Sequence, residues 1–453
     1  MVRRITMLVP VMALASACSG KAEPAPTPYD ITAAAPMIDA YIDQRDDAPA
    51  DATSTLSDWL KKKHFSASDV EGLLRAPRAS YPPLTVNPGH EIGLESIDCY
   101  HVVYSSMYYL FVPETYDASK AWPLVFVGHG GNSSMTLDEA EAAAKNYIYT
   151  YRTSLHTDSF QPILVAPATT VGWSPVGDSL VESSISKVIR EYNVDADKVY
   201  VVGQSMGGHL SWRSALKFSD RFAAYSPQSG GYTNYIDNHQ IQNLYATHGY
   251  TTFGSMDIYD LTATNITLGN WLAANKYDWT IVEKTGGHDI YSDEQPKIAA
   301  FFEAHPRDLY RRTTYLYSSG SMVYDGNWGG QDQQIVANHP LRWNYRHWVE
   351  ITPRPDTPDP LTFFAKNNGG NQLELHTSNV RHLTVLLHPN MVDMTKPVVI
   401  TINGVEAYNA VPTVDIGQML ERVREFDDRG RIFHAAIGLD VATDEIVPDP
   451  VVQ

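Results

Sequence analysis

The sequence predicts an α/β protein, a mostly parallel sheet with helices on both faces, followed by a small β-rich unit that we expect to be a sandwich. Two observations lead to this class. Between residues 95 and 306, short apolar strand-like runs alternate with helix-like segments, as they do around a buried parallel sheet. After residue 307 strand-like runs follow one another, and Asn403-Gly404 between two of them is typical of a β-hairpin.

Length and composition bound the class of function. At 453 residues the chain exceeds one ordinary domain, and its 43% hydrophobic and 19% charged residues suffice for a sizeable core. The net charge of -18 argues against a nucleic-acid partner, because no basic patch would neutralise phosphates. There is no CxxC or HExxH spacing, so we expect neither a metal nor a cofactor.

The amino terminus is typical of an export signal. A basic start and a short apolar run, too short for a permanent membrane span, lead into Ala15-Ser16-Ala17-Cys18. This resembles the bacterial lipobox, in which the cysteine becomes the lipidated first residue. The alternative is an ordinary secretory signal cleaved after Ala17. A serine after the cysteine, here Ser19, is similar to the pattern of lipoproteins that are sorted to the outer membrane. We therefore expect an outer-membrane lipoprotein facing the periplasm or cell surface, or otherwise a periplasmic or secreted protein.

We expect five segments along the chain. They are a signal peptide (1–18), a flexible Ser/Ala/Pro/Gly-rich linker (19–34), a helical extension (35–94), a catalytic unit (95–306) and a β-rich unit (307–453).

A nucleophile-elbow pattern ends one strand of the catalytic unit. The apolar run Val199–Val202 leads into Gly203-Gln204-Ser205-Met206-Gly207, and a helix-forming stretch follows. The glycines two residues before and after the serine permit a sharp turn that presents its hydroxyl. We therefore predict Ser205 as a nucleophile and the backbone N–H of Met206 as one oxyanion donor.

A second glycine-rich turn ends an earlier strand. The predicted strand Trp122–Val127 opens into Gly128-His129-Gly130-Gly131. Glycines at this place let the main chain approach a substrate oxygen, so the N–H groups of Gly130 and Gly131 are the other predicted oxyanion donors.

Several motifs occur in the order of a known family. The order is Tyr109–Tyr116, Trp122–Val125, His129–Gly131, Asp197–Gly208 and Arg221–Ala224. Together they resemble the α/β-hydrolase serine esterases, the group of feruloyl and acetylxylan esterases, polyhydroxybutyrate depolymerases and predicted peptidases. The resemblance covers about residues 100–304. It implies an α/β-hydrolase fold and hydrolysis of small-molecule or polymer-linked carboxylic esters through a Ser-His-Asp triad and an acyl-enzyme.

The expected base is His288. In α/β-hydrolases the triad follows the chain order serine, acid, histidine. Thr285-Gly286-Gly287-His288 follows the predicted strand Trp279–Val282, and its glycines allow the loop to fold back over the serine. His209, one helical turn after Ser205, is expected to point away from the reaction.

The sequence indicates the acid of the triad less clearly than the serine and the histidine. We expect it after a predicted strand at Leu244–Thr247, but the position where similar enzymes usually carry aspartate holds Thr252. An insertion would bring Asp257 into the role. Asp260 is the alternative and Asp237 a more distant one.

Aromatic and polar residues suggest where substrates contact the chain. Trp173, Gln204 and His129 are candidates for a substrate pocket, although Trp173 is as consistent with a structural aromatic. The aromatic residues of the β-rich unit are candidates for carbohydrate contact, and they fit equally a sandwich core. Alternatives to the esterase are a serine peptidase on the same fold and a non-catalytic surface-binding lipoprotein, the latter suggested by Thr252.

Overall fold

The computed structural model describes residues 25–83, 95–98, 105–132, 134–170, 172–173, 176–231, 238–318, 344–353, 360–442 and 447. The lipobox with Cys18 and the distant candidate Asp237 lie outside the described residues.

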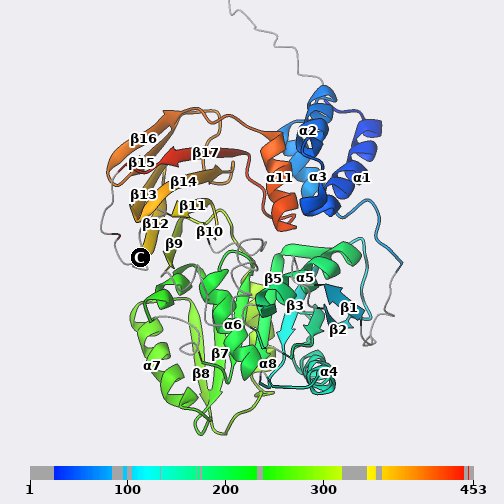
Figure 1. The fold of residues 1–453 in the computed structure, drawn as a ribbon, viewed down its shortest axis with the longest axis vertical. Helices are drawn as coiled ribbons and strands as arrows, with labels where there is room; N and C mark the ends of the chain where they lie inside the picture. Colours follow the sequence, from blue (N-terminus) through cyan, green and yellow to red (C-terminus); the bar gives the residue numbers. More distant parts are fainter. Residues whose placement is uncertain are drawn as a thin grey trace, which may run out of the picture.

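The catalytic unit contains an eight-stranded sheet with the order β1-β2-β4-β3-β5-β6-β7-β8 (Figure 1). The strands β1 and β2 run antiparallel to their neighbours, and all strands from β3 onward are parallel. This topology confirms the predicted α/β-hydrolase fold. The strands are β1 (Glu95–Asp98), β2 (Ser105–Phe111), β3 (Trp122–Gly128), β4 (Ile163–Pro167), β5 (Val194–Gln204), β6 (Ala224–Gln228), β7 (Gly249–Gly254) and β8 (Trp279–Lys284).

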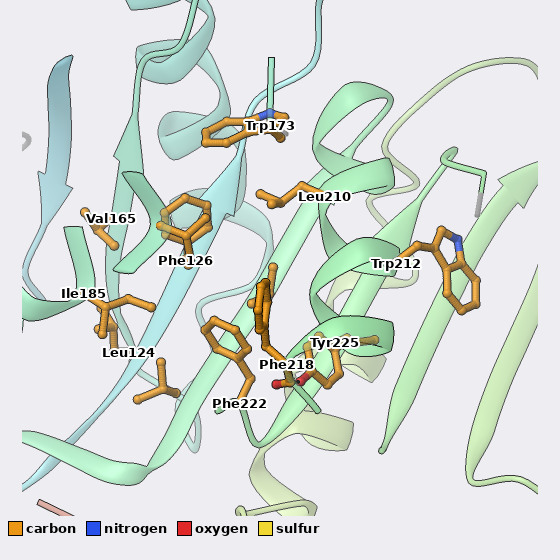
Figure 2. Close-up of a cluster of buried hydrophobic side chains, with 14 of the residues drawn as sticks. Leu124, Phe126, Val165, Trp173, Ile185, Leu210, Trp212, Phe218, Phe222 and Tyr225 are labelled. Carbon is orange, nitrogen blue, oxygen red and sulfur yellow. Dashed lines mark hydrogen bonds between the residues drawn. The ribbon is translucent and has the colours of Figure 1, made fainter. Parts of the chain in front are cut away.

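Helices cover both faces of this sheet. Alternate residues of β3 show the division, because Leu124 and Phe126 enter one buried cluster while Val125 and Val127 enter another. Figure 2 shows part of the first cluster, with Leu210 of α6 near Phe126 and Trp173, and Trp212 on the other side of the same helix. The helices are α4 (Leu137–Ser154), α5 (Val176–Glu191), α6 (Met206–Lys217), α7 (Leu261–Ala274) and α8 (Gln295–Ala304), with the 3₁₀ segment η2 (Asn238–Ala246).

The prediction of a strand at Leu244–Thr247 is wrong. Leu244 belongs to η2, and the strand β7 begins only at Gly249. The Asn243 side chain donates to the carbonyls of Leu216 and Tyr317, which holds this segment as a helical turn against β9. A short buried apolar run does not distinguish strand from helix by its periodicity, so the sequence pattern was ambiguous here.

The β-rich unit is built from two sheets that share one hydrophobic core, as predicted. Their orders are β10-β11-β14-β17 and β16-β15-β13-β12-β9. Asn403 and Gly404 have φ of 50° and 75° and connect β15 to β16, as the hairpin signal predicts. The elements are β9 (Thr313–Ser318), β10 (Tyr345–Arg346), β11 (Val349–Pro353), β12 (Leu361–Gly369), β13 (Gln372–Ser378), β14 (Val380–Leu387), β15 (Val398–Ile402), β16 (Val405–Ala410), α11 (Ile416–Phe426) and β17 (Ala435–Asp440).

The aromatic side chains of this unit that the structure describes belong mainly to its interior. Trp348 and Tyr315 are both buried. We therefore assign these two residues to packing rather than to carbohydrate contact.

The amino-terminal helices pack against α11 rather than against the catalytic sheet. Figure 1 shows α1 (Pro28–Gln44), α2 (Ala52–Lys62) and α3 (Ala67–Arg75) grouped beside α11. The helix α1 begins at Pro28, before the expected boundary at residue 35. A capping box between Thr27 and Asp30 starts it there, and Pro36 lies inside the helix without ending it. No helix in the described part of the chain is long and apolar enough to cross a bilayer.

Buried ion pairs join the catalytic and β-rich units. The Arg307 guanidinium donates to both carboxylate oxygens of Asp428, at 2.6 and 2.9 Å, and to Asp197 at 3.0 Å. Asp197 lies in the first half of β5, so the β-rich unit contacts the amino ends of the parallel strands. Burial opposes ionisation of Asp428, but Arg307 and Arg221 hold its pKa well below the usual range.

We expect Asp428→Ala to lower the free energy of unfolding by about 3–5 kcal/mol, because it leaves buried guanidinium groups without their carboxylate. The carboxylate of Asp428 is 0% exposed. The matched control is Asp440→Ala, whose carboxylate is 94% exposed beside His382 and whose loss should leave stability unchanged. Urea titration of both variants measures the difference, and equal stabilities would contradict a structural role for the buried network.

Candidate active site

Ser205 occupies a strained turn between β5 and α6. It is the N-cap of α6 with φ 59° and ψ −120°, a backbone conformation that non-glycine residues rarely adopt. Its N–H donates to the Gln228 carbonyl at 3.0 Å, which ties the turn to the end of β6. This is the strand–turn–helix geometry of a nucleophile elbow.

The elbow depends on close backbone contact between β3 and α6. A Cβ on Gly207 would lie 1.9 Å from the Gly128 carbonyl oxygen, and one on Gly203 would lie 2.6 Å from the same atom. Any side chain at these two positions would force the strand and helix apart. The glycines of the motif are thus required by packing as well as by the turn.

The loop after β3 lies directly against the serine. A Cβ on Gly130 would lie 3.2 Å from the Ser205 Cβ, and Gly131 has φ 134°. The structure therefore brings the predicted oxyanion loop and the elbow together at the carboxyl end of the sheet. Met206, the residue after the serine, begins α6 at the same place.

His129 and Trp173 hold the loop after β3 in place through hydrogen bonds. His129 Nε2 accepts the Thr169 N–H at 3.0 Å, and Trp173 Nε1 donates to the His129 carbonyl at 3.0 Å. Burial lowers the pKa of His129 to about 4, so the ring is neutral. Both side chains are buried, so they support the loop, and their place in a substrate pocket stays a prediction.

Tyr147 on α4 is a residue of this site that the sequence reasoning missed. Its hydroxyl donates to Gln204 Oε1 at 2.5 Å, and it lies 2.2 Å from where a Cβ on Gly130 would stand. Burial raises the pKa of Tyr147 to about 12, against the opposing effect of the Gly130 amide. Gln204 is therefore held by a neighbour in the site. The only sequence signal for Tyr147 is the helical spacing of buried residues along α4.

For the ester hydrolysis that the sequence motifs predict, we expect Tyr147→Phe to lower kcat with a short p-nitrophenyl ester about fivefold, with KM and melting temperature little changed. The hydroxyl orders Gln204 and the Gly130 amide beside Ser205, and one such hydrogen bond contributes about 1 kcal/mol. Tyr149→Phe is the matched control, because Tyr149 is on the same helix but exposed. A kcat equal to that of the control would contradict this role.

Asp257 and His288 form a hydrogen-bonded pair. His288 Nδ1 lies 2.6 Å from Asp257 Oδ1, and the two side chains are 21% and 0% exposed. Because the carboxylate only accepts, Nδ1 carries the proton and Nε2 of the neutral ring keeps its lone pair. His288 Nε2 is buried and has no hydrogen-bond partner among the described residues.

The local environment keeps Asp257 ionised. Burial alone would raise its pKa, but hydrogen bonds from His288 and the Ile258 amide outweigh burial and hold the pKa below its usual value. Ser229 adds a further hydrogen bond. The carboxylate is thus suited to orient the imidazole and to stabilise it when protonated.

The position of β7 explains the departure at Thr252. Thr252 is buried inside the strand, which ends at Gly254, and Asp257 follows three residues later. Asp260 is exposed at the start of α7 and has φ 58°. The structure therefore brings Asp257, and not Asp260, to His288.

Close packing of two loops produces this pairing. A Cβ on Gly254 would lie 2.2 Å from the Gly287 carbonyl oxygen, and the Met256 N–H donates to the Gly286 carbonyl at 2.9 Å. The loop after β8 therefore runs along the loop after β7, which sets His288 beside Asp257.

Hydrogen bonds tie both the histidine loop and the serine to the end of β6. The Ser229 hydroxyl donates to the carbonyl of Asp289, the residue after His288, at 3.2 Å. The Ser205 N–H donates to the carbonyl of Gln228, the residue before Ser229. Since β5, β7 and β8 are parallel, the residues after them share one sheet edge. The His209 ring is bound to the segment after β6, because its Nδ1 lies 2.6 Å from the Gly231 carbonyl oxygen.

Comparison with known proteins found solved structures that resemble this chain in fold. No protein-family model and no curated protein matches the chain. Among solved structures, a thermostable esterase is 19% identical with a TM-score of 0.40, and the match covers 47% of this chain and 62% of that one. The chain thus spans less than two thirds of that esterase.

Two further solved structures represent different activities. The feruloyl esterase module from Clostridium thermocellum is 16% identical with a TM-score of 0.36, and the match covers 49% of this chain and 90% of the module. Porphyromonas gingivalis dipeptidyl peptidase 4 is 13% identical with a TM-score of 0.36, over 47% of this chain and 35% of that one. These are hydrolases of the α/β-hydrolase type, the group that the sequence motifs resemble.

Proposed function

We propose that the chain is a serine hydrolase that cleaves carboxylic esters through an acyl-enzyme. The observation that carries this is the ionised Asp257 bound to His288 Nδ1, with Nε2 left as a base, on the sheet edge where the strained turn holds Ser205. Serine is a weak nucleophile without such a base, and this combination supplies one.

In the proposed acylation step, His288 Nε2 takes the proton of Ser205 Oγ as Oγ bonds to the ester carbon. The carbonyl oxygen becomes an oxyanion, and the N–H groups of Met206 and Gly131 donate to it. The Gly130 N–H, the other predicted donor, interacts with the Tyr147 hydroxyl and would have to turn from it to the oxyanion. Collapse of this intermediate breaks the bond to the alkoxy group, which leaves as the alcohol with the proton from His288.

Water then completes the cycle. His288 Nε2 takes a proton from water as its oxygen attacks the acyl carbon. Collapse breaks the bond to Ser205 Oγ, which regains its proton from His288, and the carboxylic acid leaves. Catalytic hydrogen bonds commonly tighten only when substrate is bound. The lack of a hydrogen-bond partner for His288 Nε2 among the described residues therefore fits its proposed role as the base.

A peptidase on the same fold and a surface-binding protein that has lost catalysis are the two competing functions. Assays of short p-nitrophenyl esters beside aminoacyl anilides separate the first, and we expect the esters to react faster by kcat/KM. A fluorophosphonate probe separates the second, because it labels only an activated serine. Faster anilide cleavage would favour the peptidase, and an unlabelled Ser205 would favour the non-catalytic protein.

The proposed substrate is a small-molecule or polymer-linked ester outside the cytoplasm, and the chain would be held to the outer membrane by lipid on Cys18. This rests on the lipobox-like start of the sequence. We expect Cys18→Ser to abolish incorporation of an alkyne-labelled palmitate and to release the chain from the membrane fraction. Unchanged labelling and fractionation would contradict the anchor.

A further inference from the structure

A second group of titratable side chains lies at the opposite edge of the catalytic sheet. His248 Nδ1 is 2.5 Å from Asp278 Oδ2, and His305 Nε2 is 3.3 Å from the same oxygen. His248 and Asp278 immediately precede the neighbouring parallel strands β7 and β8, and His305 is the C-cap of α8. Three regular elements therefore hold the group.

The hydrogen bonds of His305 turn its Nε2 toward Asp278, and the hydrogen bond to this carboxylate raises the pKa of the ring, so a metal ion would displace the proton shared between them. His305 Nδ1 lies 2.6 Å from the Phe301 carbonyl oxygen, which only accepts, so Nδ1 carries the proton. In the neutral ring the lone pair is then on Nε2, the atom that faces Asp278. A histidine that binds a metal typically donates its other N–H to a carbonyl or carboxylate in this manner.

Packing fixes the orientation of the rings. The His305 ring stacks on Phe301 with centroids 4.0 Å apart, and the His248 and His305 centroids are 4.9 Å apart. The three ligand atoms all lie within 4.8 Å of one another. Two ligands about 2.0–2.1 Å from a tetrahedral zinc ion are separated by about 3.3 Å, which is the His305–Asp278 distance.

The site is open on one side. The Asp278 carboxylate is 55% exposed, so water can complete the coordination of an ion held by the three side chains. Burial lowers the pKa of Arg311, and the charge of Asp278 opposes this effect. The Arg311 guanidinium donates to the backbone carbonyls of Ala246 and Thr313.

A similar group elsewhere in the chain shows the opposite arrangement. Glu71 contacts His388 Nε2 at 3.1 Å and His434 Nε2 at 2.9 Å. There the Asn390 N–H donates to His388 Nδ1 at 3.1 Å, so the neutral ring carries its proton on Nε2, facing Glu71. Arg75 Nε also donates to Glu71. These hydrogen bonds saturate the Glu71 carboxylate, and the Arg75 guanidinium would compete with a metal ion for it.

We propose that His248, Asp278 and His305 form a binding site for a divalent transition metal ion of the zinc type. Two imidazole nitrogens and one carboxylate are the ligands that such ions prefer. The site lies at the amino ends of β7 and β8, whereas the proposed catalytic residues follow the carboxyl ends of the strands. The ion would tie the end of α8 to the sheet, two residues before Arg307 enters the buried ion pairs. Its role is therefore to stabilise the junction of the two units.

Zinc titration of the full, chelator-stripped chain tests the site. By calorimetry we expect about one Zn²⁺ per chain and a higher melting temperature with zinc bound. Asp278→Asn and His305→Gln should each weaken binding at least tenfold and remove the thermal shift, while ester hydrolysis without zinc stays unchanged. Near-UV circular dichroism checks that the variants are folded.

Glu71→Gln is the matched control and should retain the zinc affinity of the parent chain. Absence of saturable binding to the parent overturns the proposal, whatever the behaviour of the variants. Undiminished binding in both Asp278→Asn and His305→Gln overturns it as well, and so does loss of binding in Glu71→Gln, which would move the site to the other group.

Discussion

Replacing Ser205 with alanine should lower kcat for ester hydrolysis by about 10⁵–10⁶-fold while leaving the fold intact. The hydroxyl is the only atom of the proposed site that bonds covalently to the substrate, so no neighbouring group replaces it. The residual rate should come from the oxyanion donors and from binding alone. Initial rates with a short p-nitrophenyl ester measure the loss.

The control for this prediction is Ser255→Ala, because Ser255 is an exposed serine on the loop that carries Asp257. Its activity should match that of the parent chain. Fluorophosphonate labelling should vanish in Ser205→Ala and persist in Ser255→Ala. Substantial hydrolysis by Ser205→Ala would rule out the acyl-enzyme on this residue.

The second large effect is expected for Asp257→Asn, which should lower kcat by about 10³–10⁴-fold. An amide in this position can donate to His288 Nδ1 and so favours the tautomer with the proton on Nε2, where the base is needed. The change also removes the negative charge that stabilises the protonated ring. KM should change little, because Asp257 is buried behind His288.

Asp260→Asn distinguishes the two acids that the sequence leaves open. Asp260 is exposed at the start of α7, so its amide variant should keep the parent kcat. A larger loss in Asp260→Asn than in Asp257→Asn would reverse the assignment. Thermal unfolding of both variants separates loss of catalysis from loss of structure.

Local sequence patterns predicted the parts of the site that depend on local backbone geometry. The strained turn at Ser205 and the approach of Gly130 both require glycine or a fixed spacing of glycines, and such requirements are visible in a sequence. The acid was harder because it depends on where a strand ends. The prediction of a strand at Leu244–Thr247 placed that end too early, since the run belongs to a buried 3₁₀ segment.

Other features depend on contacts between distant segments, which no local pattern contains. Tyr147 reaches Gly130 only because α4 packs on the sheet, and its position on the helix resembles that of any buried aromatic. His248, Asp278 and His305 come together from three elements, so none of the usual metal-ligand spacings marks them. The start of α1 is different, because the Thr27–Asp30 capping box is a local signal that the sequence reasoning overlooked.

The β-rich unit packs at the amino ends of the parallel strands, and this determines where the start of the described chain lies relative to Ser205. The helices α1 to α3 lie beside that unit (Figure 1), so the start of the described chain and the carboxyl-end edge with Ser205 are at opposite ends of the molecule. The stretch from Ser19 to Thr27 extends at most about 30 Å. In a chain anchored at Cys18 the tether would thus leave the molecule at the end opposite Ser205, so the bilayer would not cover the proposed site and soluble or polymeric esters could reach it.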